Sequence, residues 1–179
     1  MPAKKRKSRR KPKQPRIPKE KQITTIEMEE AISRLFGIRT HIIVPNISWG
    51  LVGMHECDVF IVKTSGCAVE VEIKRSKSDL LADFKKKHNH DDERIKEFYY
   101  ALPDKLLETC EELIPEHAGI IECRRNPWSK GIVKASIKRK AKIRKGYRKL
   151  TMEEQFKVAK LGTMRIWSLK QKLIKEQNK

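Results

Sequence analysis

Two neighbouring strand-like runs joined by a tight turn constrain this chain more than any other feature. Residues 56–62 and 67–75 alternate or run apolar in the manner of β-strands. Between them, residues 64–66 read Thr-Ser-Gly and supply a short turn with a permissive glycine. The sequence therefore predicts an antiparallel hairpin centred on Ser65.

The register of this hairpin brings charged side chains together. Residues whose numbers sum to 130 face each other, so Asp58 lies opposite Glu72. In the same register Glu56 lies opposite Lys74. Side chains alternate across a strand, which places Glu70 on the same face as Glu72 and Lys74. The other face of that strand carries three apolar side chains for the core: Val69, Val71 and Ile73.

The facing carboxylates of Asp58 and Glu72 predict a metal site. Two carboxylates directly opposite one another repel, and the sheet gains nothing from the pair unless a cation lies between them. Mg²⁺, or Mn²⁺ in its place, takes a few carboxylate oxygens and retains several waters, which suits a shallow acidic site open to a phosphodiester. Lys74 on the same face is placed to stabilise an attacking hydroxide and the charge that develops on phosphorus. The pattern is typical of a metal-dependent nuclease.

A simpler interpretation of the same residues is a half-exposed hairpin with a solvated outer face. In that case the acids and the lysine only keep the strand soluble, and Glu56 and Lys74 form an ordinary cross-strand ion pair. The E-x-K triplet alone does not separate these two interpretations.

The surrounding sequence predicts an α/β domain. The first helix begins with a threonine cap at Thr24, carries acids in its first turn and ends at Gly37. The further elements expected before residue 123 are a strand over 41–47, a helix over 76–87, a strand over 97–102, a helix over 103–113 and a strand over 117–122. With the hairpin, the predicted order is αβββαβαβ.

This order of elements, together with an acid followed by an E-x-K triplet, resembles the PD-(D/E)XK nuclease superfamily. Further motifs within about residues 24–123 are similar to a small phage and bacterial branch that is related to DNA-repair-associated members. These motifs are Trp49-Gly50, His55-Glu56-Cys57-Asp58, Glu70-Val71-Glu72-Ile73-Lys74, Asp79-Leu80, Asp83-Phe84-Lys85-Lys86, Tyr99-Tyr100-Ala101-Leu102-Pro103 and residues 115–119.

The resemblance implies a single restriction-endonuclease-like domain with a mixed central sheet flanked by helices. Asp58 matches the first acid of the motif, Glu72 the second and Lys74 the lysine, whereas Cys57 stands where proline is usual. Members often add a metal-binding glutamate from the first helix.

Three glutamates of the predicted first helix are candidates for that further ligand. Glu27 and Glu29 flank the apolar face of the helix, and Glu30 points away from it. We favour Glu29, with Glu27 left open. The alternative for all three is that their negative charge complements the helix dipole.

The charge of the chain predicts a nucleic-acid partner, DNA. The formal net charge is +19, of which residues 1–21 contribute +10 and residues 124–150 contribute +12, so that the remainder is slightly acidic. Both basic segments are able to release counterions from a phosphate backbone. The residues predicted to contact phosphates are Lys4, Lys5, Arg6, Lys7, Arg9, Arg10, Lys138, Arg139 and Lys140.

The chain is expected to divide into three parts. Residues 1–21, proline-rich and basic, predict a disordered arm. Residues 22–125 form the nuclease-like domain. Residues 126–179 add a basic edge strand and a C-terminal helix from Thr151 to about Ile174, in which Gly162 could introduce a kink or a break. The sequence leaves the oligomeric state open, a homodimer included.

Several other classes of protein are disfavoured. The four cysteines lack the spacing of a zinc site, and no apolar stretch approaches the length of a membrane span. We expect a soluble cytoplasmic protein, in the host cytoplasm if a phage encodes it, that needs no membrane. The leading hypothesis is a Mg²⁺-dependent DNA endonuclease of repair, recombination or phage DNA processing. The alternative is a non-catalytic nucleic-acid-binding protein that retains the nuclease fold.

Overall fold

The computed structural model describes residues 22–47, 56–85, 92–126, 128 and 132–178. The predicted basic arm, with its six named lysines and arginines from Lys4 to Arg10, lies outside the described residues, as do Trp49 and His55. The helices are α1 (Thr25–Leu35), α2 (Lys77–Asp83), α3 (Asp104–Cys110), a 3₁₀ turn η2 (Glu111–Leu113) and α4 (Met152–Gln177). The strands are β1 (Ile42–Ile47), β2 (Cys57–Val62), β3 (Ala68–Ile73), β4 (Ile95–Pro103), β5 (Gly119–Arg125) and β6 (Val133–Arg139).

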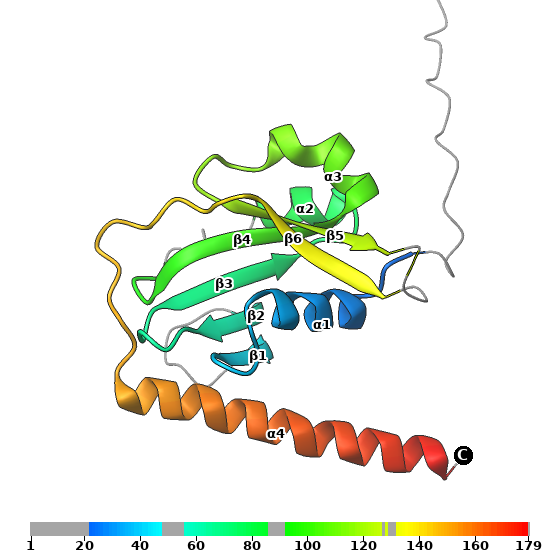
Figure 1. Cartoon of the computed structure of the whole chain (residues 1–179), viewed down its shortest axis with the longest axis vertical. Coiled ribbons are helices and arrows are strands. Elements are labelled where there is room, and N and C mark those ends of the chain that lie inside the picture. Colours follow the sequence, from blue (N-terminus) through cyan, green and yellow to red (C-terminus); the bar gives the residue numbers. More distant parts are fainter. Residues whose placement is uncertain (1–21, 48–55, 86–91, 127, 129–131, 179) are drawn as a thin grey trace, which may run out of the picture.

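The six strands form one mixed sheet in the order in which they occur along the chain (Figure 1). The pairs β1–β2, β2–β3 and β5–β6 are antiparallel, whereas β3–β4 and β4–β5 are parallel and are connected through α2 and α3. The predicted order αβββαβαβ and the α/β class are therefore confirmed. The predicted basic edge strand is β6.

The hairpin register agrees with the sequence prediction. Val59 pairs with Val71 and Phe60 pairs with Glu70, so the residue numbers of each pair sum to 130. This register places Asp58, the second residue of β2, across from Glu72, near the end of β3.

Helices cover both faces of the sheet. One face packs against α1 through Val69, Val71 and Ile73, as predicted for these three residues. The other face packs against α2, α3 and the start of α4. Because β3 is covered on both sides, all six of its residues are buried. The interpretation as a half-exposed hairpin with a solvated outer face is therefore wrong.

Helix α1 begins where the sequence predicts. The hydroxyl of Thr24 accepts a hydrogen bond from the backbone N–H of Glu27, whose carboxylate accepts one from the N–H of Thr24. This capping box satisfies two backbone donors that the helix itself leaves without partners. The buried face of α1 consists of Met28, Ala31 and Ile32.

Helix α4 runs along the β1 edge of the sheet and is continuous from Met152 to Gln177 (Figure 1). Gly162 does not break it. A Cβ at this position would lie 3.1 Å from a methyl group of Val44 in β1, so the glycine permits close approach of helix and strand. Val158 is buried in the same contact.

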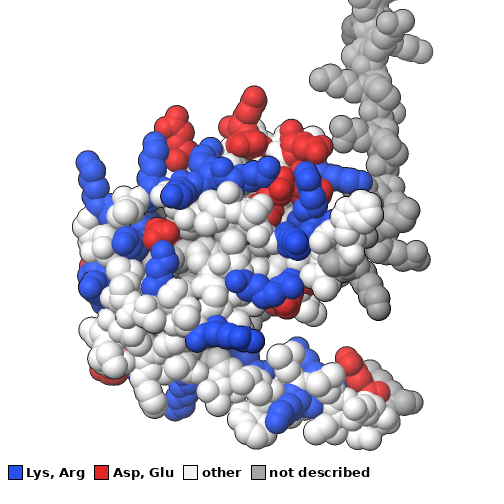
Figure 2. All heavy atoms as spheres, in the orientation of Figure 1, with Lys and Arg blue, Asp and Glu red and all other residues white. Residues whose placement is uncertain are grey.

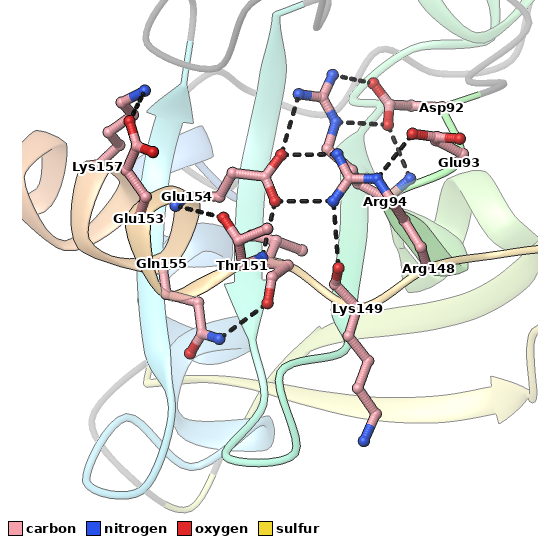
Figure 3. A network of polar contacts seen from close by, with 11 residues as sticks. Asp92, Glu93, Arg94, Arg148, Lys149, Thr151, Glu153, Glu154, Gln155 and Lys157 are labelled. Atoms are coloured by element: carbon pink, nitrogen blue, oxygen red, sulfur yellow. Dashed lines mark hydrogen bonds and ion pairs between the residues drawn. The ribbon is translucent and has the colours of Figure 1, made fainter.

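A network of ion pairs anchors the start of α4 to the turn before β4 (Figure 3). The guanidinium of Arg148 donates to both carboxylate oxygens of Glu154, at 2.7 and 2.8 Å, and to Glu93 at 2.7 Å. Arg94 lies 3.8 Å from the same Glu154. The hydrogen bonds from Arg148 lower the pKa of Glu154 to about 2. Part of the positive charge in residues 124–150 thus stabilises the fold.

Candidate active site

Three of the four residues predicted to form the site, Asp58, Glu72 and Lys74, lie together. They line one depression of about 390 Å³ at the carboxyl end of β3. Its lining residues are Thr25, Glu56, Asp58, Glu72, Ile73, Lys74, Arg75 and Asp79. In sheets with parallel strands, the carboxyl ends of the strands are the usual position for ligand sites.

Asp58 and Glu72 are held by the backbone of the opposite strand. Asp58 Oδ2 accepts a 2.7 Å hydrogen bond from the N–H of Ile73, and Glu72 Oε1 accepts a 3.4 Å one from the N–H of Asp58. Within the described residues Asp58 Oδ1 makes no hydrogen bond. The hairpin register therefore fixes both carboxylates and leaves an oxygen available to a ligand.

Lys74 lies at the centre of a buried polar chain. Its ammonium donates to Glu72 Oε2 at 2.8 Å and to Asp83 Oδ1 at 2.9 Å, and the hydroxyl of Tyr100 donates to Asp83 Oδ2 at 2.8 Å. The side chain of Lys74 is only 4% exposed. The alternative of a solvated ion pair between Lys74 and Glu56 is therefore wrong, because the partners of Lys74 are Glu72 and Asp83.

Burial shapes the protonation of this chain. Burial, and then the negative charge of Asp58, raise the pKa of Glu72 to about 7, although Lys74 opposes the shift. Burial acts to lower the pKa of Lys74, but the charges and hydrogen bonds of Glu72 and Asp83 outweigh it and raise that pKa. Near neutral pH Lys74 is therefore charged, whereas Glu72 is partly protonated. A cation bound beside Glu72 would favour its ionised form.

The donor set suits a magnesium-like ion rather than a caged metal. In the described part of the chain, no group of three or more His, Cys, Asp or Glu side chains is arranged to hold a metal. Mg²⁺ commonly binds through one or two carboxylates and completes its coordination with water and substrate phosphate oxygens. Asp58 and Glu72 offer two carboxylates of this kind in one open depression.

Of the three glutamates considered in α1, Glu29 is the one that interacts with Asp58. Burial first, and then the charge of Asp58, raise the pKa of Glu29. Its Oε1 accepts a 2.9 Å hydrogen bond from Asn46, and it lines a neighbouring depression that shares Glu56 with the acidic one. In this arrangement Glu29 stands beside the site rather than within it.

The other two α1 glutamates are engaged elsewhere. Glu27 Oε1 accepts a 2.7 Å hydrogen bond from Arg125, and this contact, with the capping box, lowers the pKa of Glu27 to about 2. Glu30 pairs with Arg34 at 2.7 Å.

The basic side chains in and just after β6 that are predicted to contact phosphate differ in whether they already have partners within the fold. Arg139 is half-buried and donates to three backbone carbonyls, those of Ile114, Pro115 and Ala118. Lys138 lies 3.4 Å from Glu122, and Lys140 is exposed. Figure 2 shows lysines and arginines spread over the viewed face, with most of its acids near α3. The backbone carbonyls thus occupy the guanidinium of Arg139, whereas Lys140 is exposed and can contact a ligand.

Sequence reasoning assigned no role to Asp83 and Tyr100, which the structure places against Lys74. A signal existed for Asp83: it follows the buried Leu80 by three positions and so shares its helix face, which points at the sheet. An acid on a core-facing position needs a buried partner. Tyr100 lies in one of the motifs that carry the family resemblance, but nothing in the sequence around it indicates a contact with Asp83.

In the part of the chain that the structure describes, no helix is long and apolar enough to cross a membrane.

Comparison with known proteins gives a fold and leaves the function open. No protein-family model matches the chain, and no curated protein matches it significantly. A solved structure, the SPO1766 protein of unknown function from Silicibacter pomeroyi, is similar with a TM-score of 0.57 and 18% sequence identity. The similarity covers 85% of this chain and 92% of that one. The chain therefore shares its overall α/β fold with that protein.

Proposed function

We propose that this protein is a divalent-metal-dependent DNA endonuclease that acts in DNA repair, recombination or phage DNA processing. The observation that supports it is the convergence of Asp58, Glu72 and the Lys74 ammonium on one open depression at the carboxyl end of β3. This is the arrangement expected of the PD-(D/E)XK resemblance, and a bound cation would offset the repulsion between the two acids.

Asp58 and Glu72 are the residues that would hold the Mg²⁺ or Mn²⁺ ion, and Glu29, in the adjoining depression, is the candidate for a further ligand. When bound, the ion would polarise the scissile phosphate and lower the pKa of a water. In the absence of an ion, the negative charge of Glu72 is available for this role above its raised pKa, about 7.

Lys74 would stabilise the charge of the reacting phosphate. An ammonium has three N–H donors, of which Glu72 and Asp83 take one each. The third is available to a phosphate oxygen or to the attacking water. Asp83 and Tyr100 are positioning residues, because they fix the direction of the Lys74 side chain without touching the substrate.

The alternative is a DNA-binding protein that does not cleave. The placement of Glu29 against Asn46, outside the depression, favours it, because the further glutamate ligand that the resemblance implies is held by another side chain. Under this alternative the protein binds DNA through its basic segments and the buried Lys74 chain serves stability alone.

The experiment that separates the two is incubation of the purified protein with supercoiled plasmid, single-stranded DNA and branched DNA. Each substrate is tested with Mg²⁺, with Mn²⁺ and with EDTA. We expect cleavage of at least one substrate, only in the presence of a divalent ion. Binding without cleavage under all of these conditions favours the non-catalytic alternative.

A further inference from the structure

A fully exposed tryptophan stands at the tip of the hairpin that joins β5 to β6. Trp128 is 93% exposed. Two hydrogen bonds join the described residues around it: the N–H of Asn126 donates to the carbonyl of Ile132 at 2.9 Å, and the N–H of Trp128 donates to Asn126 Oδ1 at 3.1 Å. A tryptophan ring offers a large and rigid apolar surface, so Trp128 is able to cover a flat ligand that reaches it.

The position of this turn relates it to the acidic depression. Strands β3, β4 and β5 are parallel, so the tip that follows Arg125 lies at the same end of the sheet as the acids after β3. Arg125 lines a second depression, of about 440 Å³, which Arg75 and Lys105 also line. Arg75 also lines the acidic depression. The two depressions therefore share Arg75, and the second one is also lined by Arg125, the last residue of β5 before Trp128.

The charge of this region favours a polyanion. The acids nearest the tip are already paired: Asp104 lies 3.3 Å from Arg124, and Glu27 2.7 Å from Arg125. Lys105 is exposed, and Arg75 uses its Nε to donate to the carbonyl of Ile23 at 3.0 Å. Within the described residues the terminal nitrogens of Arg75 make no hydrogen bond and can meet a phosphate.

We propose that Trp128 stacks on an unpaired base of a DNA strand whose backbone passes Lys105 and Arg75 into the acidic depression. The inference rests on the proposed function and specifies its substrate class: DNA with unpaired nucleotides next to the scissile phosphate. An aromatic ring at an exposed tip can cover a base face only where that base is not already stacked in a duplex. Base–aromatic stacking is sequence-tolerant, which agrees with a site that otherwise offers phosphate contacts.

The test is DNA affinity in EDTA, measured by fluorescence anisotropy with a single-stranded oligonucleotide and with a duplex of the same length. The proteins are wild type, Trp128→Ala and Trp128→Phe, with Trp167→Ala as the matched control because Trp167 is exposed on α4. We expect Trp128→Ala to weaken single-strand binding by about 5-fold or more. Duplex affinity should change by less than about 2-fold, Trp128→Phe should retain most of the affinity, and Trp167→Ala should bind as wild type.

Unchanged single-strand affinity of Trp128→Ala overturns the proposal, and so does an equal loss on single strand and duplex. Wild-type protein that does not bind the single strand overturns it as well. The measurement needs neither metal nor cleavage, so it fails or succeeds independently of the proposed nuclease activity. A base-stacking effect in a protein that never cleaves DNA would reject the nuclease and keep the stacking site.

Discussion

The ammonium of Lys74 lies 2.9 Å from Oδ1 of Asp83, the last residue of α2. The contact joins the residue after β3 to the helix that follows it, and neither side chain is more than 4% exposed. The same ammonium also bonds to Glu72. The position of the Glu72 carboxylate therefore depends on Asp83 of α2, although Asp83 itself does not line the depression.

We expect Asp83→Asn to destabilise the protein by about 1–3 kcal/mol, because a buried ammonium loses one of its two anionic partners. Cleavage should fall as well, since Lys74 is no longer held in one direction. Urea denaturation measures the first effect. Tyr100→Phe, which removes only the hydroxyl donor to Asp83, should cost about 1 kcal/mol. Wild-type stability in Asp83→Asn would show that the contact is not formed in solution.

The raised pKa of Glu72 predicts a pH-dependent stability without metal. The carboxyl ionises near pH 4.5 in the unfolded chain and near pH 7 in the folded protein. Between these values the folded protein holds the proton more tightly, so the stability from this group is present at low pH and is lost as the pH rises toward 7. Glu72→Gln also removes an anionic partner of Lys74, but at pH 8 it replaces a carboxylate whose charged form burial and then Asp58 disfavour by more than Lys74 stabilises it. We expect this variant in EDTA to be as stable as wild type or more stable at pH 8, by about 2 kcal/mol or less, and to lose that advantage at pH 5.

The comparison requires urea denaturation of both proteins at the two pH values. Glu97→Gln is the matched control, because Glu97 is also a strand carboxylate paired with a lysine, Lys63, at 2.7 Å. The quantity compared is the free energy of unfolding of Glu72→Gln minus that of wild type. A smaller difference at pH 8 than at pH 5 would contradict the raised pKa of Glu72.

Replacement of Lys74 by methionine tests its role at the phosphate. The methionine preserves most of the stem and removes the ammonium, so turnover should fall about 100-fold or more while metal binding stays nearly unchanged. Lys63→Met removes a lysine from an equivalent ion pair outside the site and should retain turnover. Circular dichroism of both variants checks that the fold persists. Equal turnover of Lys74→Met and wild type would reduce Lys74 to a structural residue.

Deletion of residues 1–21 separates affinity from chemistry. These residues contribute +10 to the net charge and no residue of the candidate site. Fewer counterions are released when fewer cations neutralise phosphates, so DNA binding should weaken at low salt and its salt dependence should become shallower. Turnover at saturating DNA should survive. A salt titration of affinity for both proteins provides the measurement, and an unchanged slope would mean that the arm does not touch DNA.

Much of the fold could be predicted because local signals agree with the tertiary structure. The capping boxes at Thr24 and Thr151, the turn at Gly66 and the alternation in β6 each specify an element or its boundary. The hairpin register followed from the turn alone, and it brought Asp58 opposite Glu72 as expected.

The rest depended on packing between segments far apart in the sequence. The burial of β3 on both faces requires α2, and the sequence of the strand does not show that this helix covers it. Under that cover Lys74 is buried and is paired with Asp83. Gly162 resembled a helix breaker because its contact with Val44, more than a hundred residues away, cannot be inferred from local sequence. The engagement of Arg139 by backbone carbonyls is hidden for the same reason.

The most direct test of the central claim is single-turnover cleavage of an end-labelled DNA substrate by wild type, Asp58→Asn, Glu72→Gln and Glu97→Gln, each with Mg²⁺ and with EDTA. Saturating protein removes differences in affinity, and the three variants each replace one carboxylate by its amide. We expect Mg²⁺-dependent cleavage by wild type and Glu97→Gln and none by Asp58→Asn or Glu72→Gln. Cleavage by either of these two variants at the wild-type rate, or wild-type cleavage in EDTA, would contradict this expectation.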